Sequence, residues 1–307
     1  MKSKKAENRE KRRLRRVAML PSLVTLLNAV CGFAAIHFTA RGMSEPNGLW
    51  LVRPYELTFY AAAGWMIFLA MVADGVDGFL ARLTRGTSGF GEQLDSIADM
   101  VSFGVAPAFL MLRVMESGLK ELVSPVSPIF GSIPGKLLWL IAVTYVCCAA
   151  LRLARFNVEH GHESAHLTFA GLPSPAAAGV IASLVLLFGE MEIMKNTSPS
   201  TEIISKMVIY LLPAITVIIG LLMVSRLPYG HLVNRYVKGR RPLSHLVRVV
   251  FLAFFLFWKP ELTLTISFLA YAGIPPVRWF WQSYLSRHPA LSAQNSSVKE
   301  HNGVTEP

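Results

Sequence analysis

Charged side chains are scarce in this sequence, in which 16% of the 307 residues are Asp, Glu, Lys or Arg. A soluble globular protein carries about a quarter charged residues, so this shortage argues against that class. Apolar residues take the place of the missing charges, at 53% of the chain. Several apolar runs are long enough to cross the ~30 Å of a bilayer's hydrocarbon core. We therefore expect a polytopic membrane protein.

Cysteine is also rare, with Cys31, Cys147 and Cys148 all inside apolar runs. Adjacent residues point in different directions on a helix, which predicts free thiols and excludes a disulfide framework. Acidic residues, at 19, are outnumbered by 30 basic ones, giving a net charge of +11. In a membrane protein this excess predicts attraction to anionic lipid head groups rather than to nucleic acid.

The apolar runs predict an all-α membrane helix bundle with a six-helix core and two further C-terminal membrane segments, about eight spans in all. The expected spans are 17–38, 55–73, 93–115, 136–154, 169–188, 203–224, 243–258 and 262–281. The last two could instead form one re-entrant pair. The first run lacks a clear cleavage site, so it is expected to be a retained span rather than a signal peptide.

Four regions follow from this pattern: a basic cytosolic tail (1–16), a membrane core (17–226), a basic connector with the C-terminal membrane segments (227–287) and a disordered tail (288–307). With both termini in the cytosol, most Lys and Arg residues fall in cytosolic segments, as the positive-inside rule requires. The same orientation places Arg152 and Arg155 at the cytosolic face.

Four carboxylates stand out between two apolar runs: Asp74, Asp77, Asp95 and Asp99. Spacings of three and four residues put each pair on one helix face. If the two helices pack side by side, the pairs face one gap, where four anions repel one another unless cations lie between them. Carboxylate oxygens favour hard cations such as Mg²⁺, Mn²⁺ or Ca²⁺. A single Asp at a helix end is usually a cap, but two facing pairs predict a functional metal site.

Small and basic residues accompany the carboxylates. Gly78 and Ala81 share the helix face of Asp74, so a flat ligand could approach closely there. Arg82 and Arg85 place positive charge at the rim, where a diphosphate could be held. Metal ligands, a slot of small residues and rim arginines together favour phosphoryl transfer.

The spacing of these residues resembles the full signature of the CDP-alcohol phosphatidyltransferase family: Asp74-x2-Asp77-Gly78-x2-Ala81-Arg82-x8-Gly91-x3-Asp95-x3-Asp99. The resemblance spans about residues 17 to 226. The stretches 102–107, 152–157, 171–176 and 223–229 resemble the branch that uses serine as the acceptor alcohol. One departure lies in the first span, where relatives often carry Pro-Asn and this chain has Pro21-Ser22.

This resemblance implies that the four aspartates hold one or two Mg²⁺ or Mn²⁺ ions and that Asp99 is the general base. It implies that Gly78, Ala81 and Arg82 bind the CDP moiety of CDP-diacylglycerol. The expected reaction transfers the phosphatidyl group to L-serine, giving phosphatidylserine and CMP. It further implies a homodimer among membrane lipids, in a bacterial inner membrane, with the active site facing the cytosol.

Binding of the serine carboxylate is a separate question, for which Arg152 and Arg155 are the candidates, assisted by Asn157. The two arginines could instead anchor their helix to anionic head groups. Other acceptors are possible with the same chemistry: glycerol 3-phosphate, an inositol compound or choline. A cation transporter is an alternative from another class, although transport sites usually lie near the membrane midplane.

Overall fold

A computed structural model describes residues 22–42, 49–52, 55–84, 89–122, 133–160, 171–194, 199–227, 229 and 255–287 of the chain. Within these ranges, six helices are long and apolar enough to cross a membrane: Ser22–Gly42, Phe59–Leu80, Gly89–Gly118, Ile133–Val158, Ser174–Ile193 and Ser200–Val224. The protein is an integral membrane protein, and the predicted all-α polytopic bundle is confirmed. The predicted tails at 1–16 and 288–307 lie outside the described residues.

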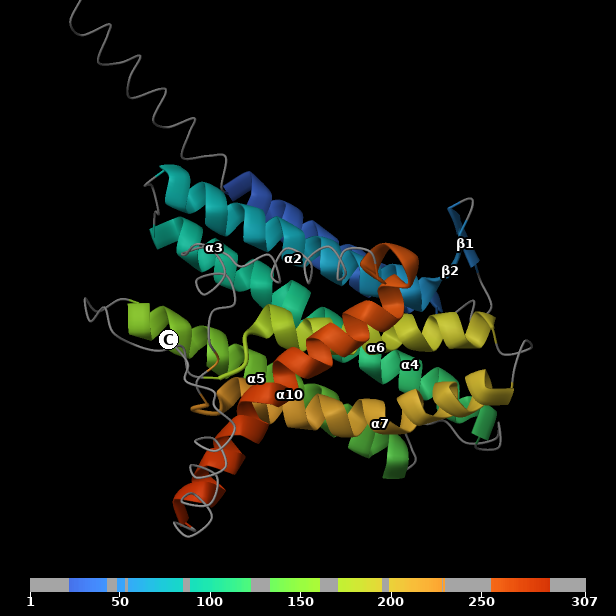
Figure 1. The fold of residues 1–307 in the computed structure, drawn as a ribbon. Coiled ribbons are helices and arrows are strands. Elements are labelled where there is room, and N and C mark those ends of the chain that lie inside the picture. The colour runs from blue at the N-terminus through green and yellow to red at the C-terminus, as the bar shows by residue number, and fades with distance from the viewer. Residues whose placement is uncertain are drawn as a thin grey trace, which may run out of the picture.

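Figure 1 shows how the helices are arranged. The N-terminal helix Ser22–Gly42 is followed by a hairpin and then by the remaining helices. Their bounds are β1 (Leu49–Val52), β2 (Tyr55–Thr58), α2 (Phe59–Thr84), α3 (Gly89–Asp99), η1 (Met100–Val105), α4 (Ala106–Leu122), α5 (Ile133–His160), α6 (Ser174–Ile193), α7 (Pro199–Val224) and α10 (Pro260–Arg287).

A small antiparallel hairpin of β1 and β2 precedes α2, and it corrects the predicted start of the second span. That span was expected from residue 55, but residues 55–58 pair with β1 and the helix begins at Phe59. The Thr58 hydroxyl accepts a hydrogen bond from the Ala61 backbone N–H at 3.2 Å. A threonine just before the first turn satisfies a free helical N–H, which is why the helix starts there. Likewise, the fifth span was expected from residue 169, but residues 171–173 are not helical and α6 begins at Ser174.

The third span is continuous but not uniform, because α3, η1 and α4 follow one another without a break. The middle segment, η1, is a π-helix. Such wide turns are rare and commonly occur at functional sites.

Helix α6 forms the centre of the bundle and packs against α2, α7 and α10. Most of its residues are buried, including the run Ala176, Ala177, Ala178 and Gly179. Small side chains let neighbouring helices approach closely, which is the usual basis of packing in a membrane.

The start of α6 is tied to the end of α7 through Gly171. The Gly171 N–H donates to the Leu227 carbonyl at 2.9 Å, and the Leu172 N–H donates to the Leu222 carbonyl at 3.0 Å. Gly171 has φ +92°, and a Cβ added there would lie 2.3 Å from the Met223 carbonyl oxygen. Only glycine fits this backbone conformation, and the turn at Gly171 fixes where α6 starts.

Helix α10 crosses over α6 in Figure 1 and lies outside the six candidate spans. Its Phe268 ring occupies the space beside Gly179, and the Thr265 hydroxyl donates to the Ser183 carbonyl at 2.9 Å. The predicted membrane segment 262–281 is thus a packed helix whose Thr, Ser and Pro residues make it less apolar than the other six. Of the predicted segment 243–258, only residues 255–258 are described, and they are helical.

The cysteine prediction is confirmed, because Cys31, Cys147 and Cys148 are all free thiols.

Candidate active site

Three of the four predicted aspartates converge at one end of the bundle. Asp74 comes from α2, and Asp95 and Asp99 come from α3. Each offers a carboxylate oxygen, and these oxygens all lie within 4.8 Å of one another. Carboxylates from the two acidic helix segments therefore face one gap, as predicted, for three of the four aspartates.

Asp77 lies one turn beyond Asp74 and has a different hydrogen-bond environment. It is 7% exposed, and its Oδ2 accepts a hydrogen bond from the Thr25 hydroxyl of the N-terminal helix. Its other oxygen, Oδ1, is buried and has no hydrogen-bond partner within the part of the chain that the structure describes. A buried carboxylate oxygen without a partner is costly unless a cation compensates it.

These features fit a divalent cation. All the donors are carboxylate oxygens, which suit Mg²⁺, Mn²⁺ or Ca²⁺ rather than a thiolate-bound metal. Such an ion requires several negatively charged oxygen ligands. These are present in the clustered oxygens of Asp74, Asp95 and Asp99 and in the unpaired oxygen of Asp77.

Asn28 of the N-terminal helix holds Asp99 in place. Its side-chain Nδ2 donates to Asp99 Oδ1 at 3.0 Å, and Asn28 is fully buried. The Ser102 hydroxyl donates to the Asn28 backbone carbonyl at 2.9 Å. The two helices approach closely at this point, since a Cβ added to Gly32 would lie 2.3 Å from Ser102 Oγ.

The π-helical turn of η1 begins directly after Asp99 and is held from two sides. Ser102 bonds to the N-terminal helix, as described above, and the Tyr145 hydroxyl of α5 donates to the Phe103 carbonyl at 3.0 Å. Both Ser102 and Phe103 are fully buried. The wide turn therefore sets the position of Asp99 against two other helices.

Thr25 and Asn28 are functional candidates that the sequence reasoning missed. They and Gly32 are spaced by three and four residues, so they share one face of the first span. Polar residues on one face of an apolar helix commonly point into the bundle, and that signal could have identified them.

Arg152 of α5 reaches the interior beside Asp99. Its Nη1 donates to the Ser174 hydroxyl at 2.8 Å, at the first residue of α6. Its Nε is buried and has no hydrogen-bond partner among the described residues. Arg152 is close enough to Asp99 for their charges to interact, and Tyr145 and Tyr271 are in the same neighbourhood. An inward guanidinium with an unused donor suits an anionic ligand group.

The other two residues predicted to bind the serine carboxylate lie nearer the surface than Arg152. Arg155 is exposed, one turn along α5 from Arg152. The Asn157 amide donates to the Ser96 hydroxyl at 2.9 Å, so Asn157 links α5 to α3 between Asp95 and Asp99. Arg152 thus lies beside the carboxylates, whereas the Arg155 side chain is exposed.

The predicted CDP-binding residues lie along the end of α2. Among the described residues, a Cβ added to Gly78 would meet nothing within 4 Å, so these residues leave open space beside the helix. Ala81 and Arg82 belong to the last turns of α2, but their side chains are outside the described residues, as is Arg85 entirely. The large side chains of Val76, Phe79 and Leu83 on the same stretch are exposed.

Comparison with known proteins finds one family and relatives that share one name. Residues 18–225 match the family model of the CDP-alcohol phosphatidyltransferases. The chain is 31% identical over 223 residues to the CDP-diacylglycerol--serine O-phosphatidyltransferase of Methanocaldococcus jannaschii, covering 72% of this chain and 79% of the relative. The Helicobacter pylori enzyme of the same name is 29% identical, covering 72% and 81%. That of Bacillus subtilis is 34% identical, covering 52% and 70%.

Proposed function

The chain belongs to the CDP-alcohol phosphatidyltransferase family, and we propose that it transfers the phosphatidyl group of CDP-diacylglycerol to the hydroxyl of L-serine, giving phosphatidylserine and CMP. The observation that carries this proposal is the convergence of Asp74, Asp95 and Asp99 within 4.8 Å, with the Arg152 guanidinium beside them.

Asp74, Asp77, Asp95 and Asp99 would hold one or two Mg²⁺ or Mn²⁺ ions, whose charge would offset that of the substrate diphosphate. Gly78, Ala81 and Arg82 would bind the CDP moiety. The open space beside Gly78 supports this role, because it leaves room for a ligand against the helix backbone.

The acyl chains of the substrate could stay in the bilayer throughout. Exposed Val76, Phe79 and Leu83 give the outer side of α2 an apolar surface next to the carboxylates. A lipid lying along that surface would present its diphosphate to the aspartates at the helix end without leaving the membrane.

Asp99 is assigned as the general base. Asn28 occupies its Oδ1 with one hydrogen bond, which leaves Oδ2 to accept the proton of the serine hydroxyl. The serine oxygen then attacks the lipid-side phosphorus, a new P–O bond forms, and the P–O bond to CMP breaks. CMP leaves with the electrons of that bond.

Arg152 is assigned to the serine carboxylate. Its unpaired Nε and its nearness to Asp99 would place the acceptor with its carboxylate on the guanidinium and its hydroxyl toward the base. Choline carries a cation that Arg152 would repel. A phosphate-bearing acceptor calls for a denser group of arginines than Arg152 and Arg155 provide.

We also propose that the site faces the cytosol of a bacterial inner membrane and that the enzyme is a homodimer. The bias of Lys and Arg toward the predicted cytosolic segments supports the orientation. A cation transporter fits less well, because Asp74 and Asp77 lie near the end of the span Phe59–Leu80 rather than at its middle.

The test is an acceptor panel. Purified protein in detergent receives CDP-diacylglycerol with Mn²⁺ or Mg²⁺ and one acceptor at a time, and CMP release is measured. Serine should support release at a rate at least tenfold above glycerol 3-phosphate, inositol or choline. Faster release with another acceptor would overturn the assignment of serine, and no release with any acceptor would overturn the proposed chemistry.

A further inference from the structure

A second candidate site lies at the opposite end of the bundle. A cavity of about 460 Å³ is formed by the start of α2, the end of α6 and the residues that lead into α10. Ala61 in this cavity precedes Asp77 by 16 residues on α2, so the two sites are about 24 Å apart along the helix at 1.5 Å per residue. The cavity is therefore separate from the carboxylate cluster and lies at the opposite end of the span Phe59–Leu80.

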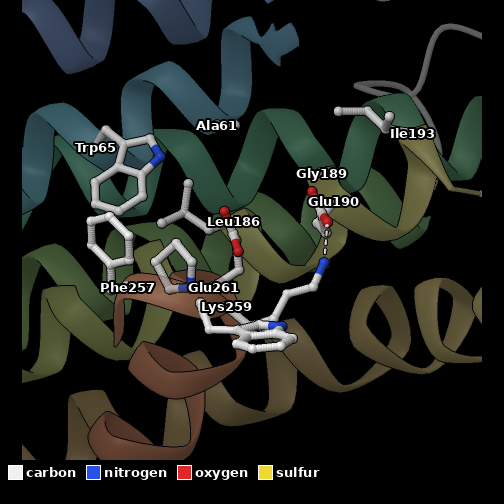
Figure 2. A pocket seen from close by; sticks show the side chains of 11 residues that line it. Ala61, Trp65, Leu186, Gly189, Glu190, Ile193, Phe257, Lys259 and Glu261 are labelled. Atoms are coloured by element: carbon white, nitrogen blue, oxygen red, sulfur yellow. Dashed lines mark hydrogen bonds and ion pairs between the residues drawn. The ribbon is translucent and has the colours of Figure 1, made fainter. Parts of the chain in front are cut away.

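The cavity combines aromatic rings with charges of both signs. Figure 2 shows the rings of Trp65 and Phe257 on one side, the ion pair of Glu190 and Lys259 on the other, and Glu261 between them. The Lys259 ammonium and the Glu190 carboxylate are 3.1 Å apart. Leu186 adds an apolar wall.

The charges do not balance within the cavity. Lys259 pairs with Glu190, whereas the Glu261 carboxylate makes no ion pair among the residues that the structure describes. Glu261 is only partly exposed, and it experiences the negative charge of Glu190 as well as the positive charge of Lys259, which already pairs with Glu190. An ammonium group entering the cavity would pair with the Glu261 carboxylate, and the faces of Trp65 and Phe257 would attract the same group.

The position of the cavity, at the end of membrane-spanning helices, indicates which kind of cationic group would bind there. Tryptophan and other aromatic rings at the end of a membrane helix mark the level of the lipid head groups. The half-exposed Lys259 would meet a phosphate there, since a surface ion pair such as Lys259–Glu190 is weak and readily exchanged. An ammonium, a phosphate and an apolar tail are the three parts of a zwitterionic phospholipid.

We infer that this cavity binds the head group of a zwitterionic phospholipid, with its ammonium at Glu261 between the rings of Trp65 and Phe257 and its phosphate at Lys259. The first part of the acyl chains would lie against Leu186. The inference does not depend on the proposed reaction, because none of these residues belongs to the catalytic end.

Native mass spectrometry of the purified, delipidated full-length protein tests it. The probes are dioleoyl phosphatidylethanolamine and dioleoyl phosphatidylglycerol, which share their chains and differ in whether the head group carries an ammonium. The wild-type protein should retain one phosphatidylethanolamine in preference to phosphatidylglycerol. Glu261→Gln should weaken that retention about tenfold, as expected for the loss of one contact with a charged group, and leave phosphatidylglycerol unchanged.

Glu202→Gln is the matched control, because Glu202 is an exposed carboxylate near the start of α7, at the same end of the bundle, and pairs with Lys206. It should not alter lipid retention. A melting curve and the rate of CMP release check that Glu261→Gln is folded. Equal retention of the two lipids by the wild type, or unchanged retention by Glu261→Gln, would overturn the inference. So would a lipid-free dimer that Glu261→Gln dissociates, since a second copy would then cover the cavity.

Discussion

Asn28→Ala isolates the contribution of a single hydrogen bond to catalysis. The side-chain Nδ2 of Asn28 is 3.0 Å from Asp99 Oδ1, so the substitution removes one bond to the proposed base. The link between the N-terminal helix and η1 should survive, because the Ser102 hydroxyl donates to the backbone carbonyl of Asn28 and not to its side chain.

The magnitude follows from the kind of bond that is lost. A hydrogen bond to a charged group contributes about 1.5–3 kcal/mol. If that stabilisation acts in the transition state by orienting Asp99, kcat should fall about 10- to 100-fold. The loss of folding stability should be smaller, because Asn28 Oδ1 is buried without a partner and its removal offsets part of the cost.

The assay is initial CMP release by purified protein at saturating serine and CDP-diacylglycerol, together with a thermal melt. Thr39→Ala is the matched control. Thr39 is a buried polar residue of the same helix, and among the described residues its hydroxyl bonds to the Ala35 carbonyl one turn away and to no other group. It should leave kcat unchanged. If Asn28→Ala kept kcat within twofold of wild type, the claim that Asn28 positions Asp99 would be refuted.

Three further predictions address the site. Asp99→Asn should abolish CMP release while binding of CDP-diacylglycerol persists, and near-normal turnover by the purified variant would rule out Asp99 as the base. Arg152→Lys should raise the KM for serine about tenfold and leave that for CDP-diacylglycerol unchanged, because Lys cannot reproduce a bidentate contact; exposed Arg155→Lys should have little effect, and the reverse order would exchange their roles. Removal of divalent ions with EDTA should stop CMP release and also lower the melting temperature, because the clustered carboxylates then repel one another. Restoration of both by Mn²⁺ or Mg²⁺ is expected, and an unchanged melting temperature would contradict a structural role for the ion.

The acidic cluster could be predicted from sequence because its signal is local. Asp74 and Asp77, and Asp95 and Asp99, each fall on one helix face by spacing alone, and carboxylates between apolar runs have few explanations other than a shared site. The number of membrane helices in the core could be predicted for the same reason, because the hydropathy of an apolar segment depends on no other part of the chain.

The supporting contacts could not be predicted in the same way. The bonds of Asn28 and Thr25 join residues 71 and 52 positions apart, so they depend on which helices become neighbours. The bonds that hold η1, from Ser102 to Asn28 and from Tyr145 to Phe103, join residues 74 and 42 positions apart and form only in the folded bundle. Residues three apart on a helix differ by about 60° in direction, and the packing of α5 alone decides that Arg152 rather than Arg155 points inward.

The contact between Gly179 and Phe268 has a consequence for protein engineering. Gly179 lies within the segment that matches the family, whereas Phe268 lies beyond it, and a Cβ on the former would be 2.3 Å from the ring of the latter. Replacing the C-terminal portion with that of a relative would therefore place a different side chain against Gly179, and the two helices would no longer fit together. A hybrid enzyme of that kind should be joined so that residues 179 and 268 come from the same parent.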